Sequence, residues 1–432
     1  MRTSARSAAL DAVVRVTEQG GFSNLAIPGA LRRAELSPED RALATELAYG
    51  TIRRKLSLDW AIDRHASRPV RRMTSHVRAL LRLGAYQLLC TRIPPHAAVS
   101  ETVGLGGPRE RGFVNAVLRR LADDPPAWPT GAGDEDVAVR TGLAPWGVGE
   151  LRRLVGDEAE AAAEALARQA PLSLRVNTCR TSVEEARASL RAAGREPQPA
   201  TVHPDCLLLD RAGDPLELPG FREGDLTVQD QASAFVVSVL DPGPGDRVLD
   251  ACAGPGGKAV YAACLVEPGG AVVAGELNPR RAGLVARTAA RLGARVLVVA
   301  QDATVPAALG PFDRVLVDAP CTGIGSARRR PELLWRAEKA DLSGLARLQV
   351  GIATAAADLL APGGRLVFSV CTFPRAETDA AADAIRRHRP DLEPEPTPGP
   401  DGESDRHRLW PHRHGCDAMF VAAFRRRAEV GP

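Results

Sequence analysis

The sequence has few lysines, no long apolar runs and no closely spaced cysteine pairs. Of its 56 basic residues only Lys55, Lys258 and Lys339 are lysines, so arginine supplies nearly all of the positive charge. No apolar run approaches the roughly 18 residues that a membrane-spanning helix needs. Residues 1–16 also lack the apolar stretch and cleavage site of a secretory signal. We therefore expect a cytoplasmic protein without a membrane partner.

The cysteines lie far apart and form no metal-binding pattern. None belongs to a CxxC pair, and His412 and His414 have no ligand-spaced cysteine near them, which argues against a structural metal site. A large chain without a secretory signal is expected to keep its thiols reduced, so a working cysteine would act as a thiolate and not as half of a disulfide. The cysteines are Cys90, Cys179, Cys206, Cys252, Cys264, Cys321, Cys371 and Cys416.

The length and the charge distribution suggest several domains with different surfaces. A chain of 432 residues is long enough for two or three domains of roughly 150 residues each. The net charge is +3, but residues 1–125 hold 20 basic and 12 acidic residues, and the remainder is acidic overall. Such a surplus is typical of a solvated helical surface, and it also suits a domain that contacts the phosphates of a polyanion. Charge alone favours the first interpretation.

Hydrophobic periodicity divides the chain into four parts. Residues 1–125 repeat apolar positions at helical spacing, and Ser37, followed by proline, is a typical helix start. Residues 126–170 begin as a Pro- and Gly-rich linker and end as helix. Residues 171–225 indicate a strand, a helix and a second strand, which together form a small βαβ insert. Residues 226–432 alternate strands with helices, which predicts a doubly wound parallel sheet.

Individual elements are predicted within the last two parts. The insert is expected to hold strands at 172–178 and 206–209 and a helix at 182–193. Helices are expected at 279–292 and 338–360. The expected strands of the larger sheet are 247–250, 271–274, 296–299, 314–318 and 365–368.

A glycine-rich loop, DACAGPGGK at 250–258, follows the first strand of the larger sheet. Ligands bind beyond the carboxyl ends of parallel strands, where glycine lets the backbone approach a ligand and the next helix presents amide groups. The loop is not a nucleotide-triphosphate P-loop, since Cys252 and Ala259 occupy the positions of its required glycine and hydroxyl residue. It also lacks the third glycine of a dinucleotide motif at the required spacing. A tight turn without a ligand remains the alternative.

Four acidic residues follow four successive predicted strands. Asp250 ends the first, and Glu276 lies about 25 residues later, where an acceptor for ribose hydroxyl groups is expected in a nucleoside site. Asp302 follows the third strand and is placed to accept from an adenine amino group, and Asp318 ends the fourth. Because the carboxyl ends of parallel strands share one edge, these four acids predict a pocket.

These motifs resemble those of a known enzyme family. The stretch RGFVNAVLR at 111–119 is similar to the RNA-binding domain named for the antitermination factor NusB. A NusB-like front followed by the motifs of residues 226–432 resembles the Sun/Fmu (RsmB-type) 16S rRNA methyltransferases. The motifs that closely resemble the S-adenosylmethionine-dependent RNA cytosine carbon-5 methyltransferases are the loop at 250–258, Glu276, Asp302, DAPCTGIG at 318–325 and FSVCTF at 368–373.

The resemblance implies a fold, a cofactor and a substrate. The fold would be an all-helical NusB-like N-terminal domain, the small βαβ insert and a Rossmann-like methyltransferase domain. The cofactor would be S-adenosyl-L-methionine, and the partner would be the rRNA of the small subunit. We expect a monomer. The implied cofactor contacts are Cys252, Ala253, Gly254, Pro255, Gly256, Gly257, Lys258, Glu276, Asp302 and Asp318.

Two cysteines are candidates for catalysis. Carbon 5 of cytosine is a poor nucleophile until a thiolate adds to carbon 6, and a thiol with a pKa of about 8.5 needs a site that favours its anion at neutral pH. Cys321 and Cys371 both follow strands at the expected cofactor edge, and this reasoning does not rank them. The resemblance implies that Cys371 attacks, that Cys321 assists product release, and that Asp318 contacts the cytosine ring. Lys258 is expected to orient Asp318 or the base.

Other interpretations remain open. A non-catalytic RNA-binding or antitermination-like protein would have lost site residues, yet both cysteines and all four acids are present. The same chemistry on another rRNA or on tRNA would differ only in the front domain. The three arginines at 328–330 are candidates for a phosphate contact. The sequence departs most from the family pattern at 417–420 (DAMF), which bears on a substrate-facing C-terminal strand.

Overall fold

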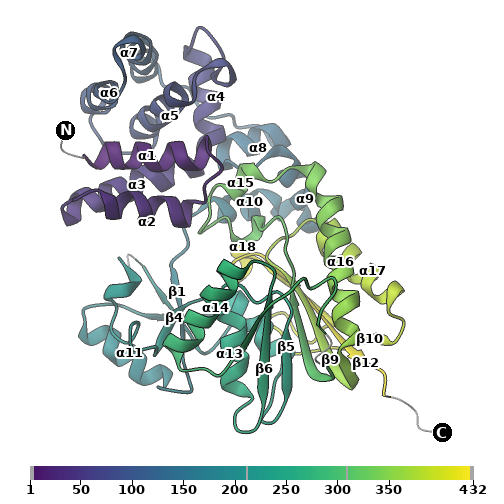
Figure 1. Ribbon diagram of the computed structural model, residues 1–432. Helices are drawn as coiled ribbons and strands as arrows, with labels where there is room; N and C mark the ends of the chain where they lie inside the picture. The colour runs from purple at the N-terminus through teal and green to yellow at the C-terminus, as the bar shows by residue number, and fades with distance from the viewer. Residues whose placement is uncertain (1–3, 211–212, 308–309, 429–432) are drawn as a thin grey trace. The chain divides into compact units, whose positions relative to one another are not determined.

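The computed structural model describes residues 4–210, 213–307 and 310–428 (Figure 1). The chain divides into two compact units. The first contains the residues up to Arg168 together with Ser326–Glu338, and the second contains Gln169–Gly325 and the chain from Lys339 onward. We call Ser326–Glu338 the insertion segment, because it belongs to the first unit although it lies between two parts of the second. No helix among the described residues is long and apolar enough to cross a membrane.

The first unit is helical, as the sequence predicts. Ser37 caps α3 by accepting a hydrogen bond from the amide of Asp40, and Pro38 is the first residue of that helix. Helix α8, which lies in the expected linker region, was not predicted. The helices of this unit are α1 (Ala5–Thr17), α2 (Ser23–Arg33), α3 (Pro38–Arg53), α4 (Lys55–His65), α5 (Ser75–Cys90), α6 (Pro95–Gly104), α7 (Pro108–Asp123), α8 (Asp134–Thr141), α9 (Pro145–Val155), α10 (Ala159–Ala167) and, in the insertion segment, α15 (Leu333–Arg336).

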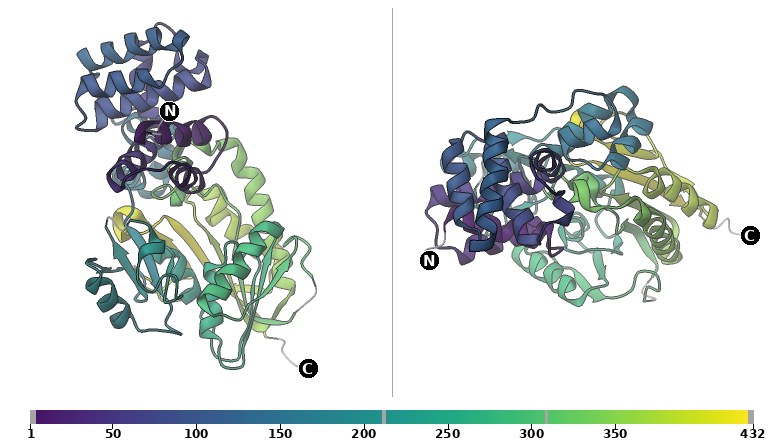
Figure 2. Two further views of the ribbon diagram at one scale, coloured as in Figure 1. Left: turned by 60° about the vertical axis from the view of Figure 1, so that its left-hand side comes forward. Right: turned by 90° about the horizontal axis from the view of Figure 1, so that it is seen from above.

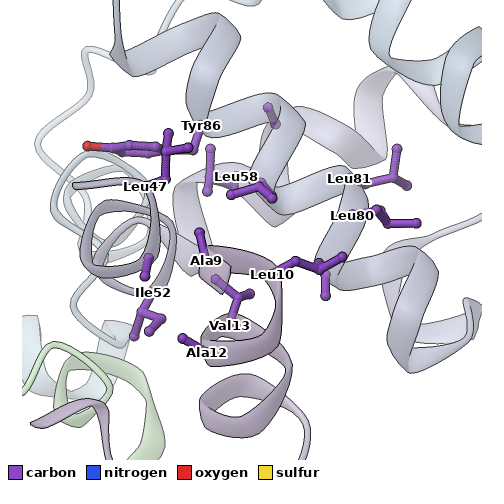
Figure 3. Packing of buried hydrophobic residues seen from close by; sticks show 14 of the residues in the cluster. Ala9, Leu10, Ala12, Val13, Leu47, Ile52, Leu58, Leu80, Leu81 and Tyr86 are labelled. Carbon is purple, nitrogen blue, oxygen red and sulfur yellow. The ribbon is translucent and has the colours of Figure 1, made fainter. Parts of the chain in front are cut away.

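The core of this unit forms where the apolar faces of α1, α3, α4 and α5 meet (Figure 3). Helix α1 contributes Ala9 and Val13, and α3 contributes Leu47. Gly50 of α3 lies so close to Tyr86 of α5 that a Cβ at position 50 would come within 1.9 Å of the ring. Glycine is therefore required there by packing, since a larger residue would push the two helices apart.

The insertion segment packs on the ends of three helices of the first unit. Trp335 donates its indole N–H to a carbonyl in the last turn of α3 at 2.9 Å. Arg336 donates to three carbonyl groups at and beyond the end of α1, at 2.8–3.3 Å. Glu332 is fully buried and accepts from the first amide of α2 at 3.2 Å. The segment therefore satisfies carbonyl and amide groups that helix ends leave without intrahelical partners.

The second unit begins with a small sheet. Strand β1 (Leu172–Val176), helix α11 (Val183–Ala192) and strand β3 (Cys206–Leu209) lie where the sequence predicts them. Two further strands, β2 (Gln198–Pro199) and β4 (Leu226–Val228), complete the order β2-β3-β1-β4, and the pairs are antiparallel. The arrangement is richer than the predicted βαβ insert because β2 and β4 are too short to show alternation in the sequence.

The larger sheet has the order β10-β12-β9-β8-β5-β6-β7, with β11 paired to β12. Strands β9, β8, β5, β6 and β7 are parallel, as expected, whereas β12 pairs antiparallel with β9 and makes the sheet mixed. The strands are β5 (Arg247–Asp250), β6 (Ala271–Glu276), β7 (Leu297–Ala300), β8 (Phe312–Asp318), β9 (Leu360–Val370), β10 (Leu392–Pro394), β11 (Arg406–Leu409) and β12 (Met419–Arg426).

Helices cover both faces of this sheet (Figure 1 and Figure 2). Strand residues alternate between two clusters: Val248 and Leu316 pack on one face, and Leu249 and Val317 on the other. The first face is covered by α12 (Gln231–Leu240), α13 (Gly257–Leu265) and α14 (Pro279–Leu292), and the second by α16 (Leu342–Asp358) and α17 (Asp379–His388). The expectation of a doubly wound sheet is confirmed for the parallel strands.

One expectation about the cysteines is wrong. Cys179, which follows β1, and Cys264, in α13, form a disulfide with a Cα–Cα separation of 5.9 Å. The sequence predicts reduced thiols because a large chain without a secretory signal is expected to keep them reduced, and the two residues are 85 positions apart. Only the packing of the small sheet beside α13 brings them together. Cys90, Cys206, Cys252, Cys321, Cys371 and Cys416 carry free thiols.

The insertion segment makes a testable contribution to the stability of the first unit. We expect Arg336→Ala to lower the free energy of unfolding by about 1–3 kcal/mol, because several carbonyl groups at the end of α1 lose a charged donor. Arg32→Ala, on the exposed face of α2, is the matched control and should change stability by less than about 0.5 kcal/mol. Urea unfolding followed by circular dichroism measures both, and equal effects of the two substitutions would contradict the assignment.

Candidate active site

The glycine-rich loop is held between the neighbouring strands of β5. The amide of Ala251 donates to the carbonyl of Leu316 in β8 at 2.9 Å. The amide of Ala253 donates to the carbonyl of Gly275 in β6 at 2.8 Å. Gly256, the residue before α13, has a φ of +108°, a conformation that favours glycine. Hydrogen bonds to β8 and β6 therefore fix the backbone of the loop between β5 and α13.

Glu276, at the end of β6, binds the loop from one side. Its carboxylate accepts from the amide of Gly254 at 3.1 Å and from the amide of Asn278 at 3.0 Å. A Cβ at Gly254 would lie 2.2 Å from this carboxylate, so the close approach requires glycine. Arg281 lies 3.5 Å from the same carboxylate and donates to the carbonyl of Gly254 at 2.9 Å.

Asp250 and Asp302 lie in opposite environments. Asp250 is 1% exposed; its Oδ1 accepts from the amide of Cys252 at 3.3 Å, and its Oδ2 has no hydrogen-bond partner among the described residues. Burial, and after it the negative charge of Asp318, raises the pKa of Asp250 to about 7. Asp302 is exposed, and hydrogen bonds from the hydroxyl and the amide of Thr304 lower its pKa.

These groups fit a nucleoside cofactor. Gly254 and Gly256 let the loop pack closely against Glu276 and Val285, since a Cβ at either position would lie within 3.1 Å of them. Asp250 offers an oxygen without a partner, and the carboxylate of Asp302 faces solvent at the end of a neighbouring strand. Carboxylates of this kind accept hydrogen bonds from ribose hydroxyl and amino groups. The loop and its neighbouring acids therefore suit a nucleoside, and their assignment as cofactor contacts stays a prediction.

Lys258, Asp318 and Ser369 form a hydrogen-bonded group at the ends of α13, β8 and β9. The Lys258 ammonium donates to Asp318 Oδ2 at 2.7 Å, and the Ser369 hydroxyl donates to Oδ1 at 2.9 Å. The Lys258 side chain is only 12% exposed. Burial alone would lower the pKa of Lys258, but the contact with Asp318 outweighs it, so the pKa is raised and the ammonium form is kept.

The sulfur atoms of Cys321 and Cys371 are 3.5 Å apart. Cys321 follows β8 and Cys371 follows β9, and both side chains are partly exposed. A hydrogen bond from Cys321 lowers the pKa of Cys371, and the charge of Lys258 acts in the same direction, against burial and Asp318. The same hydrogen bond, together with burial, raises the pKa of Cys321. The contact therefore favours the thiolate form of Cys371 and the thiol form of Cys321.

Several residues that the sequence did not single out hold the two cysteine loops. The amide of Gly325 donates to the carbonyl of Cys371 at 3.0 Å, and the carbonyl of Gly325 accepts from the amide of Ala418 at 3.0 Å. Glu377 lies in a short 3-10 turn at Arg375–Glu377 and accepts from the amide of Thr322. Gln349, in α16, donates to Glu377. Nothing in the spacing of these residues indicated burial at the site.

Two further regions singled out in the sequence belong to different units. Arg330 belongs to the insertion segment in the first unit, where its guanidinium lies over the ring of Phe22, 5.0 Å from the ring centre. Residues 417–420, where the sequence departs most from the family pattern, lead into β12, and Phe420 pairs with Val370 of β9 beside Cys371. The C-terminal strand is therefore a direct neighbour of the strand that carries Cys371.

Comparisons with known proteins match the whole chain. Residues 237–425 match a family described as 16S rRNA methyltransferase RsmB/F, residues 3–123 match the NusB family, and residues 144–215 match the ferredoxin-like domain of RsmF/B-like methyltransferases. A putative methyltransferase of Mycobacterium tuberculosis is 39% identical over 98% of this chain and 96% of its own. The probable ribosomal RNA small subunit methyltransferase B of Bacillus subtilis is 32% identical over 99% of both chains.

Solved structures agree with these matches. The crystal structure of a protein designated PH0851 has a TM-score of 0.84 at 25% identity and covers 97% of this chain and 98% of its own. A methyltransferase homologue from Pyrococcus horikoshii has a TM-score of 0.58 at 26% identity and covers 68% of this chain and 99% of its own. The expected helical NusB-like and Rossmann-like methyltransferase folds are thus confirmed.

The thiol pair makes a prediction about cysteine reactivity. Alkylation of Cys371 by iodoacetamide should follow a pH midpoint below that of an ordinary thiol, because Cys321 stabilises the thiolate. Cys321→Ala removes that hydrogen bond and should raise the midpoint, so that alkylation at neutral pH slows. Peptide mass spectrometry over a pH series measures the rate, and Cys90→Ala is the control. An unchanged or lower midpoint in Cys321→Ala would exclude the assigned hydrogen bond.

Proposed function

Because the chain belongs to the RsmB/F family of rRNA methyltransferases, which use S-adenosylmethionine, we propose that it methylates carbon 5 of a cytosine in 16S rRNA through a covalent cysteine adduct. One observation carries this proposal: two thiols of opposite protonation preference lie 3.5 Å apart beside the Lys258–Asp318 pair. A methyltransferase acting on an oxygen or an exocyclic nitrogen would have no use for a thiolate at this position.

We assign the cofactor to the glycine-rich loop and the strand ends beside it. When bound, S-adenosylmethionine supplies an electrophilic methyl group. Glu276 holds the loop through Gly254 and accepts from the ribose, while Asp302 accepts from the adenine amino group. The residues assigned to cofactor binding are Cys252, Ala253, Gly254, Pro255, Gly256, Gly257, Lys258, Glu276, Asp302 and Asp318.

Cys371 is assigned as the nucleophile. Its lowered pKa favours the thiolate, which is the nucleophilic form of cysteine. The sulfur forms a bond to carbon 6 of cytosine, and the electron pair of the ring double bond makes carbon 5 nucleophilic. The target base is unpaired or extruded, since a thiolate and a methyl donor cannot both reach a stacked base.

Asp318 and Lys258 are assigned to the cytosine ring. Attack at carbon 6 places negative charge on the ring, and Asp318 offsets it by hydrogen-bonding the ring nitrogen with a proton that it receives from the Lys258 ammonium. Lys258 keeps a proton at this position, because its ammonium donates to Asp318 at 2.7 Å. Ser369 fixes the second oxygen of Asp318, which orients the carboxylate.

Cys321 is assigned to the second half of the reaction. After methylation, carbon 5 must lose its proton and the bond between Cys371 and carbon 6 must break. The raised pKa of Cys321 keeps its proton during the attack, and the 3.5 Å separation places this thiol beside the sulfur that must leave. Cys321 therefore assists release of the product and plays no part in forming the adduct.

The helical front is assigned to RNA binding. Residues 1–125, with 20 basic and 12 acidic residues, match the NusB family over nearly their whole length. Phosphate contacts by such a surface position an RNA but do not select a base. Selection of the target cytosine is therefore left to the site in residues 226–432.

The two cysteines predict opposite defects. Cys371→Ala should abolish methyl transfer and adduct formation, since no nucleophile remains. Cys321→Ala should form the adduct but fail to resolve it, so that a denaturation-resistant protein–RNA complex accumulates. Transfer of tritium from labelled S-adenosylmethionine and gel electrophoresis under denaturing conditions measure the two effects. Cys90→Ala, which removes an exposed thiol in the first unit, is the control and should behave as wild type. Reversed behaviour of Cys321→Ala and Cys371→Ala would exchange the assigned roles.

The substrate is tested in cells. Bisulfite sequencing of rRNA should reveal one cytosine in 16S rRNA that resists conversion in the wild-type strain and converts when the gene is deleted. The Cys90→Ala gene should restore resistance and the Cys371→Ala gene should not. A changed position in 23S rRNA or tRNA would contradict the 16S assignment, and RNA binding without any changed position would favour a non-catalytic RNA-binding protein.

A further inference from the structure

Glu377 is a buried carboxylate that lies between the loops of the two cysteines. Its side chain has no exposed surface. Oε1 accepts from the amide of Thr322 at 2.9 Å and from the side-chain amide of Gln349 at 3.0 Å. Oε2 accepts from the hydroxyl of Thr322 at 2.6 Å and lies 3.5 Å from the hydroxyl of Thr372. Four donors therefore converge on one carboxylate.

The donors are neighbours of the catalytic thiols in the chain. Thr322 follows Cys321, and Thr372 follows Cys371. The two hydroxyl oxygens are 2.7 Å apart, so they also hydrogen-bond to each other. The hydroxyls that follow both cysteines are thus joined at the same carboxylate oxygen.

Gln349 extends the tie to the other side of Cys321. Its side-chain amide nitrogen donates both to Glu377 and to the carbonyl of Pro320, each at 3.0 Å. The residue before Cys321 and the residue after it are therefore fixed by one pair of side chains. Gln349 comes from α16 and Glu377 from the turn before α17, and both helices cover the face of the sheet opposite α13.

The burial of this carboxylate is costly for the fold. A buried charge is normally compensated by an opposite charge, but the hydrogen-bond partners of Glu377 among the described residues are one backbone amide, one side-chain amide and two hydroxyls. Burial accordingly raises the pKa of Glu377 despite these donors. A neutral glutamine of the same shape would avoid the cost, so the geometry of four convergent donors points to a role that needs acceptors on both oxygens.

We propose that Glu377 is a positioning residue for the thiol pair. By accepting hydrogen bonds from both cysteine loops, it holds Cys321 and Cys371 at the separation at which the Cys321 thiol can assist release of the product from Cys371. The role rests on the proposed function of the pair. Glu377 touches neither substrate nor cofactor in this scheme. A glutamine at position 377 would turn an N–H group toward donors at one of the two oxygens, so the loops would separate.

The first test is independent of methyl transfer. Diamide oxidises two adjacent thiols to a disulfide and is itself reduced to a hydrazine, so its rate reports the approach of the two sulfurs. Peptide mass spectrometry follows formation of the Cys321–Cys371 disulfide in Glu377→Gln, in Glu377→Asp and in wild type. We expect Glu377→Gln to react about tenfold more slowly than wild type, and Glu377→Asp, which keeps both acceptor oxygens, to recover part of the rate. The matched control is Asp383→Asn, which removes a carboxylate that pairs with Arg406 at the surface, and it should react as wild type.

The second test is kinetic. We expect Glu377→Gln to lower kcat for methyl transfer about 10- to 100-fold, because misplacement of reacting groups by about 1 Å has effects of this size, with the KM values for S-adenosylmethionine and RNA unchanged. The denaturation-resistant RNA adduct should accumulate as well, since release depends on the second sulfur. If Glu377→Gln folds poorly, Thr372→Val serves as the second variant, because it removes one donor to Glu377 and keeps the side-chain volume. It should show a smaller loss of kcat of the same kind.

The outcomes separate the two proposals. A Glu377→Gln protein that folds as wild type and retains the wild-type disulfide rate and kcat would overturn the positioning role. A loss of activity that matches the loss of folded protein in thermal unfolding would show a structural role only, and would overturn it equally. If Cys321→Ala forms no RNA adduct, the proposed function fails, while the diamide rate still decides whether Glu377 positions the sulfurs.

Discussion

The parallel register of β8 against β9 is the constraint on which the site depends. It places Asp318 beside Ser369, and the two loops that follow these residues carry Cys321 and Cys371. Because side chains alternate along a strand, a shift of one residue would move Asp318 to the other face and separate it from Ser369. The 3.5 Å approach of the sulfurs, the Lys258–Asp318 contact and the Glu377 tie all follow from this one pairing.

The electrostatics of the site depend more on the burial of a few charged side chains than on how many charges are present. The charge of Asp318 disfavours the ionised form of Asp250 and so raises its pKa, and the charge of Lys258 acts on the pKa of Asp250 in the opposite direction. Arginine is far more abundant in this chain, yet the position holds one of only three lysines. A compact ammonium donates to a carboxylate in a narrow space, where a planar guanidinium would need several further acceptors.

The first unit is not a continuous stretch of sequence. The insertion segment leaves the second unit directly after Gly325, four residues beyond Cys321, and supplies Trp335 and Arg336 to helix ends of the first unit. The buried Glu332 shows that this segment is part of the fold of the unit and not a loop laid on its surface. A fragment that ends near residue 125 would therefore lack several partners of its own helices.

The local structure and the chemical character of the site were predictable from the sequence. Helix starts such as Ser37, the acids that end β5, β6 and β8, and the two cysteine motifs are all read from residues within one strand or one turn of each other. The tertiary structure decided the rest: the Cys179–Cys264 disulfide, the antiparallel strand β12, and the burial of Glu377 beneath Thr322 and Thr372. These features join residues some 50 to 85 positions apart, and no periodicity records which distant segments will pack together, because that choice depends on how the whole sheet and its helices exclude water.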